Sequence, residues 1–284
     1  MQVPRSVKLP VKRVLRSARL LTSKIRLLPD FVIIGGQRCG TTSLYNYLVA
    51  HPCVASAFAK EVHFFDLNFR KGTDWYRSHF SSLVYEYLLE RLRRKRLVTG
   101  EASPYYIFHP HAAKRVSQVL PRAKIIALLR NPVDRAYSHY HLEVRHGHES
   151  LPFDEAVEQE QERLRGEMER MLKDEDYHSF NHQHYSYLSR GVYVHQLAAW
   201  TRLFPEHQIL VLRSEALAAE PSSVYAQVLR FLGLPLWQPQ TFKPYHLARY
   251  PEMNAAVRER LTDHFAPHNH RLYELLGVNL GWEE

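Results

Sequence analysis

A short apolar run followed at once by a glycine-rich turn constrains this chain more than any other feature. The run at residues 31–34, Phe-Val-Ile-Ile, predicts a buried strand, and Gly-Gly-Gln-Arg-Cys-Gly-Thr-Thr-Ser follows at residues 35–43. Leu44, Tyr47 and Leu48 then recur at helical spacing. Free amides and the helix dipole at the start of such a helix favour an anion. The pattern therefore predicts a phosphate-binding turn.

Further short apolar runs alternate with helical segments along the rest of the chain. Strands are expected at residues 97–99, 124–130 and 208–212, and helices at residues 192–203, 222–232 and 253–276, with Pro267 breaking the last one. Short apolar strands that alternate with helices are typical of a central parallel sheet covered on both faces. We therefore expect one α/β domain, a P-loop-like three-layer sandwich, over residues 29–284.

The net charge of +9 is concentrated in an arm at residues 1–28. This arm holds eight of the 38 basic residues and no acidic one, which leaves 30 basic against 29 acidic residues, a net charge of +1, for the remainder. A nearly neutral body does not track a phosphate backbone, so we expect no nucleic-acid partner. A disordered or partly helical tail is expected, and the alternative is weak membrane-surface contact through an apolar stripe of Val11, Leu15, Leu20 and Leu21.

Apolar runs and cysteine usage favour a cytoplasmic protein. The apolar runs are far shorter than the roughly 20 residues needed to cross a bilayer, and the basic start lacks the apolar stretch of a secretory signal. Cys39 and Cys53 are too few for a disulfide framework, which fits a reducing compartment. We expect a cytoplasmic location, with a peripheral position at a membrane as the alternative.

The glycine-rich turn differs from that of nucleoside triphosphatases at one position. Gly35 and Gly40 have the spacing of the G-x-x-x-x-G-K-[ST] pattern, but Thr41 stands where that pattern has lysine. Because that lysine contacts the β- and γ-phosphates, hydrolysis of ATP or GTP is not expected. Arg38 instead places a cation earlier in the turn, and three hydroxyls follow it at residues 41–43.

A second anion site is predicted where the apolar run at residues 124–130 ends. Asn131 and Pro132 are favoured at the N-cap and the first position of a helix. Arg130 lies at the edge of the sheet where ligands collect, and Ser138 lies about two turns into the helix on nearly the same face. A guanidinium and a hydroxyl can hold a phosphate. Two separate anion sites match a nucleotide with 5′ and 3′ phosphates.

Four motifs, in order along the chain, carry a resemblance to a known family. They are the turn at residues 35–44, Lys-Glu-Val-His-Phe-Phe-Asp at 60–66 with Lys-Gly-Thr-Asp-Trp-Tyr at 71–76, Gly-Glu-Ala-Ser-Pro-Tyr-Tyr at 100–106, and Arg-Asn-Pro-Val-Asp-Arg-Ala-Tyr-Ser at 130–138. From about Phe31 to Trp282 the chain resembles sulfotransferases that use 3′-phosphoadenosine 5′-phosphosulfate (PAPS), most closely heparan sulfate N- and 3-O-sulfotransferase domains and their bacterial relatives.

This resemblance implies which residues hold PAPS and which perform the chemistry. The PAPS-binding residues would be Gly36, Gln37, Arg38, Cys39, Gly40, Thr41, Thr42, Ser43, Arg130 and Ser138. Glu61 would be the base that takes the acceptor proton, kept ionised by Lys60 or Arg38. His63 is the alternative base, although a packed histidine beside two phenylalanines is the common outcome. The segment at residues 100–106 would contribute to the substrate cleft.

Two departures from the heparan enzymes affect the expected chemistry. Arg38 stands where those enzymes usually have a lysine, so help to the leaving phosphate is expected to be electrostatic, because arginine is a poor proton donor. Ala102 replaces another of their lysines, which weakens the case for a highly anionic glycosaminoglycan acceptor. The acidic stretch from Asp154 to Asp176 weakens it further. That stretch is expected to be a solvated helix, with a lid over the acceptor cleft as the alternative.

Histidines gather in two places but do not predict a metal site. They are His139, His141, His146 and His148, and then His178, His182 and His184. No cysteine or acidic motif completes a recognised zinc pattern, so we expect histidines at the surface or in contact with substrate, and no metal. Cys39 is expected to fill space in the turn, with reactivity near the helix start as the alternative.

The sequence therefore predicts a PAPS-dependent sulfotransferase that releases 3′,5′-ADP and acts on a hydroxyl or amine, with a carbohydrate or glycolipid as the first expected acceptor. Sulfation of a small natural product or a lipid hydroxyl is the alternative. Two other classes of protein remain open, a P-loop nucleotide kinase and a noncatalytic anion-binding protein on the same scaffold. The acceptor pocket is not readable, because such pockets are built from variable loops.

Overall fold

A computed structural model describes residues 17–93, 96–243 and 250–283 of the chain. Five strands form a single all-parallel sheet in the order β2-β3-β1-β4-β5. Their bounds are Phe31–Ile33 (β1), Val54–Ser56 (β2), Val98–Ala102 (β3), Lys124–Leu129 (β4) and Ile209–Arg213 (β5). The expected central parallel sheet is confirmed.

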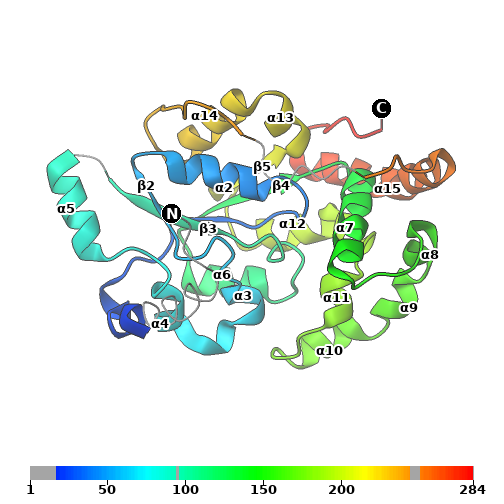
Figure 1. Ribbon diagram of the computed structural model, residues 1–284, viewed down its shortest axis with the longest axis horizontal. Coiled ribbons are helices and arrows are strands. Elements are labelled where there is room, and N and C mark those ends of the chain that lie inside the picture. Colours follow the sequence, from blue (N-terminus) through cyan, green and yellow to red (C-terminus); the bar gives the residue numbers. More distant parts are fainter. Residues whose placement is uncertain (1–16, 94–95, 244–249, 284) are drawn as a thin grey trace, which may run out of the picture.

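Helices cover both faces of this sheet (Figure 1). On one face lie α2 (Thr41–Ala50), α13 (Ser214–Ala219) and α14 (Pro221–Leu232), above the sheet in the view. On the other lie α3 (Phe64–Leu67), α4 (Gly72–Arg77), α6 (Ala112–Val119) and α12 (Tyr193–Thr201). Alternate residues of β1 enter different cores: Phe31 and Ile33 pack with α2 and α14, whereas Val32 packs with α4, α6 and α12. The expected three-layer arrangement follows from this alternation.

A helical region adjoins the carboxyl side of the sheet, at the right of Figure 1. It comprises α7 (Pro132–His146), α8 (Phe153–Glu158), α9 (Glu160–Leu164), α10 (Glu167–Lys173), α11 (Phe180–His184) and the long α15 (Ala255–Leu276). Helix α5 (Leu83–Arg93) lies at the other end of the molecule. Four short 3-10 helices complete the described elements, η1 (Ser23–Ile25), η2 (Phe69–Lys71), η3 (Ser189–Gly191) and η4 (Glu206–Gln208).

Strand β1 sits in the middle of the sheet with β3 and β4 as neighbours, and this arrangement positions the candidate site. Ligands of open parallel sheets collect beyond the carboxyl ends of the strands, where the strand order diverges. The loops after β1, β2, β3 and β4 carry the four motifs and all leave from this edge. A hollow lined by Asp30, Val98 and Lys124 among others lies at the opposite edge, and no predicted site residue lines it.

The structure differs from the expected elements in three places. The three-residue strand β2 was not expected at all. Pro267 does not break α15, which continues through it. A proline inside a helix costs about 3 kcal/mol, and burial of Phe265 and Leu272 on either side of it offsets that cost at about 1.5 to 3 kcal/mol each.

The acidic stretch 154–176 is not one solvated helix either. It is divided into the short helices α8, α9 and α10, with a break at Gly166, whose φ is 74°. Glu160 is only 5% exposed, and its buried carboxylate accepts hydrogen bonds from the amides of Leu188 (2.5 Å) and Ser189 (2.8 Å). Glu160 therefore anchors a neighbouring turn instead of facing solvent.

The end of the basic arm lies against the body of the domain. Residues 17–21 are helical, and the Arg19 guanidinium donates to the carbonyls of Ser78 (2.6 Å) and Phe80 (2.7 Å). Of the apolar stripe, Val11 and Leu15 fall outside the described residues, whereas Leu20 and Leu21 are exposed. Within the described ranges, no helix combines the length and the apolar character that crossing a membrane requires.

Candidate active site

The turn after β1 is held tightly against the sheet. The amide of Gly36 donates to the carbonyl of Leu128 in β4 at 2.8 Å, and a Cβ added at Gly36 would lie 2.6 Å from the Cys39 sulfur. Gly40 caps α2 with a φ of 84°, which side-chain-bearing residues rarely adopt. These two glycines bring the backbone around so that the first amides of α2, which have no intrahelical acceptors, face the turn.

Arg38 brings the two predicted anion sites together. It has a φ of 72°, and its Nε donates to the Ser138 hydroxyl in α7 at 2.9 Å. Arg130 lies next to both, with its guanidinium 3.5 Å from the Arg38 carbonyl oxygen. Burial lowers the pKa of Arg38, and the positive charges of Arg145 and Arg130 lower it further. The carboxyl end of β4 and the turn after β1 thus form one cationic cradle.

A buried arginine that the sequence did not single out supports the turn. Arg190 is 1% exposed and donates a short hydrogen bond to the Gln37 side-chain oxygen. The same guanidinium donates to the carbonyls of His182 (3.0 Å) and Gln183 (2.8 Å). Arg190 of η3 therefore holds the Gln37 side chain in place, so Gln37 also supports the structure of the turn.

The remaining turn residues differ in exposure. Thr41 and Ser43 are buried at 5% and 8% exposure, whereas Thr42 is half-buried. Cys39 is fully buried, and this burial raises the pKa of its thiol to about 11. A thiol of that pKa is not a thiolate at neutral pH, which favours Cys39 as a space-filling residue and disfavours the reactive alternative.

Lys60 connects the turn to the predicted base. Its ammonium donates to the Thr42 hydroxyl at 2.6 Å and lies 2.5 Å from the Glu61 carboxylate. Of the two cations expected to keep Glu61 ionised, Lys60 is the partner, and Arg38 is bonded to Ser138 instead. Lys60 also brings a lysine ammonium to the phosphate-binding turn, whose own sequence contains none.

Glu61, His63 and Asp66 form a chain of three ionisable groups. His63 Nδ1 lies 2.7 Å from the buried Asp66 carboxylate and Nε2 lies 3.2 Å from Glu61. The backbone of His63 has a φ of 52°, a conformation that its amide secures by donating to the Ser103 hydroxyl at 3.1 Å. The imidazole is therefore clamped between two carboxylates.

These contacts assign the protonation states of the pair. Burial alone lowers the pKa of His63, but its hydrogen bonds to Asp66 and Glu61 outweigh burial and raise the pKa to about 10. Burial raises the pKa of Glu61, but the hydrogen bond from His63 and the charge of Lys60 outweigh it and lower the pKa to about 2. At neutral pH Glu61 is therefore an ionised carboxylate, whereas His63 is an imidazolium that has no free lone pair.

The glycine-rich turn, with a second guanidinium and a hydroxyl beside it, is consistent with a match to a known family. The model of the sulfotransferase domain family matches residues 28–264. The chain belongs to this family. Its identification as a sulfotransferase is thereby confirmed, and enzymes of the family generally use PAPS.

Several sulfotransferases are similar to this one over most of its length. The membrane-associated sulfotransferase kil1 of Dictyostelium discoideum is 27% identical over 92% of this chain and 68% of its own. The bifunctional heparan sulfate N-deacetylase/N-sulfotransferase 1 of Caenorhabditis elegans is 30% identical over 89% of this chain, which spans only 30% of that relative. A crystal structure of a sulfotransferase from Alicyclobacillus acidocaldarius, 32% identical, superposes with a TM-score of 0.70 over 91% of this chain and 100% of that one.

Glu101 in this sulfotransferase is a buried support instead of an exposed part of the substrate cleft. It is 0% exposed, and its carboxyl group accepts from Tyr76 (2.6 Å), Ser103 (2.7 Å), Tyr106 (3.0 Å) and the amide of Val62 (3.2 Å). Ser103 is buried as well. The expectation that this part of residues 100–106 lines a cleft is wrong. Glu101 and Ser103 are buried and accept hydrogen bonds from the amides of Val62 and His63, next to Glu61.

We expect Glu101→Gln to remove a pH dependence of stability. Burial raises the pKa of Glu101 from 4.5 to about 7, although its hydrogen bonds oppose the shift. Its favourable contribution is thus present below pH 4.5 and is lost as pH rises through 7, by about 3 kcal/mol in the free energy of unfolding. Urea unfolding at pH 4.5 and at pH 8 measures this effect. The free energy of unfolding of the wild type minus that of the variant should fall by about 3 kcal/mol between the two pH values.

The control for this prediction is Glu169→Gln, which changes an exposed carboxyl group on α10. Its stability relative to wild type should stay constant between the two pH values. A Glu101→Gln variant whose stability difference is equally constant would contradict a buried, titrating Glu101.

Proposed function

We propose that this sulfotransferase moves a sulfuryl group from PAPS to a hydroxyl, or an amine, of a carbohydrate or glycolipid acceptor. The observation that carries the proposal is the cradle formed by Arg38, Arg130 and Ser138 beside a turn without the triphosphatase lysine. One phosphate of 3′,5′-ADP would lie on the turn at residues 36–43 and the 3′-phosphate on Arg130 and Ser138. A kinase would not need this second anion site.

The proposed transfer is in-line and needs no reactant besides PAPS and the acceptor. Glu61 takes the acceptor proton as the acceptor oxygen bonds to sulfur, and the bond from sulfur to the 5′-phosphate oxygen breaks. Arg38 stabilises the negative charge that develops on the departing phosphate, and Thr41, Thr42 and Ser43 hold the 5′ group. Lys60 lies 2.6 Å from the Thr42 hydroxyl, which supports the same role for its ammonium. His63 and Asp66 orient the Glu61 carboxylate.

Residues 29–284 are proposed to form the sulfotransferase domain, and residues 1–28 a basic arm that contacts an anionic membrane surface weakly. Exposed Leu20 and Leu21 near exposed Lys24 support the contact. One relative is itself described as membrane-associated.

A cytoplasmic location is supported by two free cysteines, Cys39 and Cys53, that are both buried.

A panel of acceptors with radiolabelled PAPS tests the function. Labelled sulfate is expected on a carbohydrate or glycolipid, and a labelled small natural product or lipid would support the alternative acceptors. Tight binding of PAPS with no label on any acceptor would favour a noncatalytic anion-binding protein. Transfer of phosphate from ATP would favour the kinase and overturn the proposal.

We expect sulfate transfer to proceed without a divalent ion. The cradle supplies its own cations in Arg38, Arg130 and Lys60, and the transferred sulfuryl group carries less charge than a phosphoryl group. Initial rates with EDTA should therefore equal those with added Mg²⁺. Loss of activity in EDTA that Mg²⁺ restores would contradict this account.

A further inference from the structure

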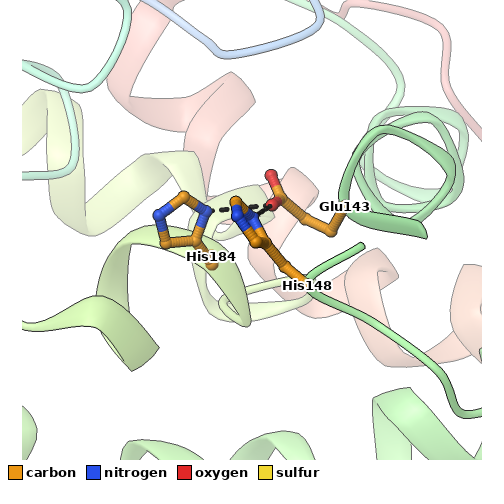
Figure 2. Close-up of side chains that lie close together, drawn as sticks. All are labelled: Glu143, His148 and His184. Atoms are coloured by element: carbon orange, nitrogen blue, oxygen red, sulfur yellow. Dashed lines mark hydrogen bonds and ion pairs between the residues drawn. The ribbon is translucent and has the colours of Figure 1, made fainter. Parts of the chain in front are cut away.

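Three potential metal ligands converge at the carboxyl-terminal end of α7. Figure 2 shows Glu143 of this helix pointing toward His148, in the following loop, and His184, the last residue of α11. The same carboxylate oxygen of Glu143 lies 2.8 Å from Nδ1 of His148 and 2.9 Å from Nδ1 of His184. All three ligand atoms lie within 4.8 Å of one another, and no other such group of three occurs in the described part of the chain.

The spacing of these atoms is close to that of a zinc site. Zinc bonds of about 2.0 to 2.2 Å in a tetrahedron place neighbouring ligand atoms about 3.3 Å apart. The distances from Glu143 to the two imidazoles are about 0.5 Å shorter than this, so small side-chain rotations would admit an ion. Two neutral imidazoles and one carboxylate are a ligand set that zinc accepts.

The neighbours of the cluster orient its members. The Glu143 side chain is 2% exposed, and its second oxygen lies 3.3 Å from Nε2 of buried His139 one turn earlier in α7. The hydroxyl of Tyr185 donates to the His148 carbonyl at 2.7 Å. The Phe180 ring packs 4.3 Å from His184 and 5.3 Å from His148, measured between ring centroids. Metal sites characteristically have such supporting contacts, which fix their ligands in place.

The histidine groupings expected from the sequence are different from those in the fold. His182, which follows His178 at helical spacing, is buried, stacked on Phe108 and 2.7 Å from the Tyr105 hydroxyl. His139 is buried as well, so neither lies at the surface as expected. His148 from the first group instead meets His184 from the second, and α7 provides the acid that the sequence pattern lacked.

We propose that Glu143, His148 and His184 bind one zinc ion that fastens α11 to the end of α7, with water as the fourth ligand. The proposed role of this ion is structural because the cluster lies away from Ser138. Glu143 lies five residues beyond Ser138, about 8 Å along the helix axis and on a different face of α7. The ion would thus stabilise the region that also holds Arg190, the support of Gln37, without taking part in sulfate transfer.

Metal content of the purified full-length protein tests this proposal. We expect about one zinc ion per chain after dialysis, and a tetrahedral d–d spectrum when Co²⁺ is added to protein stripped by a chelator. Added ZnCl₂ should raise the Tm of stripped protein, because the ion binds the folded state. His184→Ala should lose the bound zinc, the cobalt spectrum and the shift in Tm.

The matched control is His178→Ala, which removes an exposed histidine just before α11 and should leave all three readouts unchanged. Glu143→Gln, which keeps the side-chain shape, provides a second test if His184→Ala does not fold. Wild-type protein without zinc, or His184→Ala with as much zinc as wild type, would overturn the proposal and leave a hydrogen-bonded cluster only. Brief exposure to EDTA should lower the Tm while initial rates of sulfate transfer remain unchanged.

Discussion

Glu61→Gln is expected to lower kcat by about 10² to 10⁴ while leaving the affinity for 3′,5′-ADP almost unchanged. Glutamine keeps the shape of the side chain and removes its basicity. The wild-type carboxylate is ionised at neutral pH, because His63 and Lys60 lower its pKa to about 2. Steady-state rates with PAPS and an acceptor, together with calorimetric titration of 3′,5′-ADP, measure the two effects separately.

His63→Ala is the control that separates the two candidate bases. The imidazole lies between Asp66 and Glu61, which raise its pKa to about 10, so we expect it to orient Glu61 and not to take the proton. Its removal should therefore lower kcat less than Glu61→Gln does. If Glu61→Gln transfers sulfate at the wild-type rate and His63→Ala does not, the assignment of Glu61 is wrong and His63 is the base.

Arg130→Ala is expected to weaken binding of 3′,5′-ADP by about 10- to 160-fold, the equivalent of about 1.5 to 3 kcal/mol for a charge-assisted hydrogen bond. Binding of AMP, which lacks the 3′-phosphate, should change little. Calorimetric titration of the variant with both nucleotides measures this selectivity. An equal loss for the two nucleotides would mean that Arg130 acts through the 5′ site or through the fold.

Two further variants make this experiment specific. Arg130→Lys keeps the charge and loses the planar fork of donors, so it should recover part of the affinity for 3′,5′-ADP. Arg122→Ala removes an exposed arginine from the turn before β4 and should leave both affinities unchanged. An effect of Arg122→Ala as large as that of Arg130→Ala would point to net charge instead of a contact with the 3′-phosphate.

The parts of the site that could be predicted are those coded by contiguous residues. A strand, a glycine turn and a helix start follow one another at residues 31–50, and the N-cap Asn131 accepts from the amide of Val133 at 3.0 Å as its sequence predicts. Four such segments were recognisable in order, and a parallel sheet brings their carboxyl ends to one edge. The fold and the family could therefore be predicted from the chain alone.

The contacts that hold the site together could not be predicted, because they join residues far apart in sequence. Arg190 reaches Gln37 over 153 positions, and Glu101 meets the amide of Val62 over 39. Neither arginine nor glutamate signals burial in a sequence, since both are usually exposed unless they have partners. Their partners are set only when β3 and the helical region pack against β1.

The structure differs from the elements predicted from the sequence where tertiary packing outweighs a local conformational preference. Pro267 predicts a helix break, yet burial of Phe265 and Leu272 keeps α15 continuous. Strand β2 has three residues, too few for a pattern with period two to stand out from its surroundings. Its pairing with β3 nevertheless determines where the chain leaves the sheet on its way to Lys60 and Glu61.

Calorimetric titration of the wild-type protein with 3′,5′-ADP, AMP and ATP measures whether two separate anion sites hold one nucleotide. Arg38, Arg130 and Ser138 should make 3′,5′-ADP bind far more tightly than AMP or ATP in the absence of divalent ions. Equal affinities for 3′,5′-ADP and AMP, or tighter binding of ATP, would contradict the account.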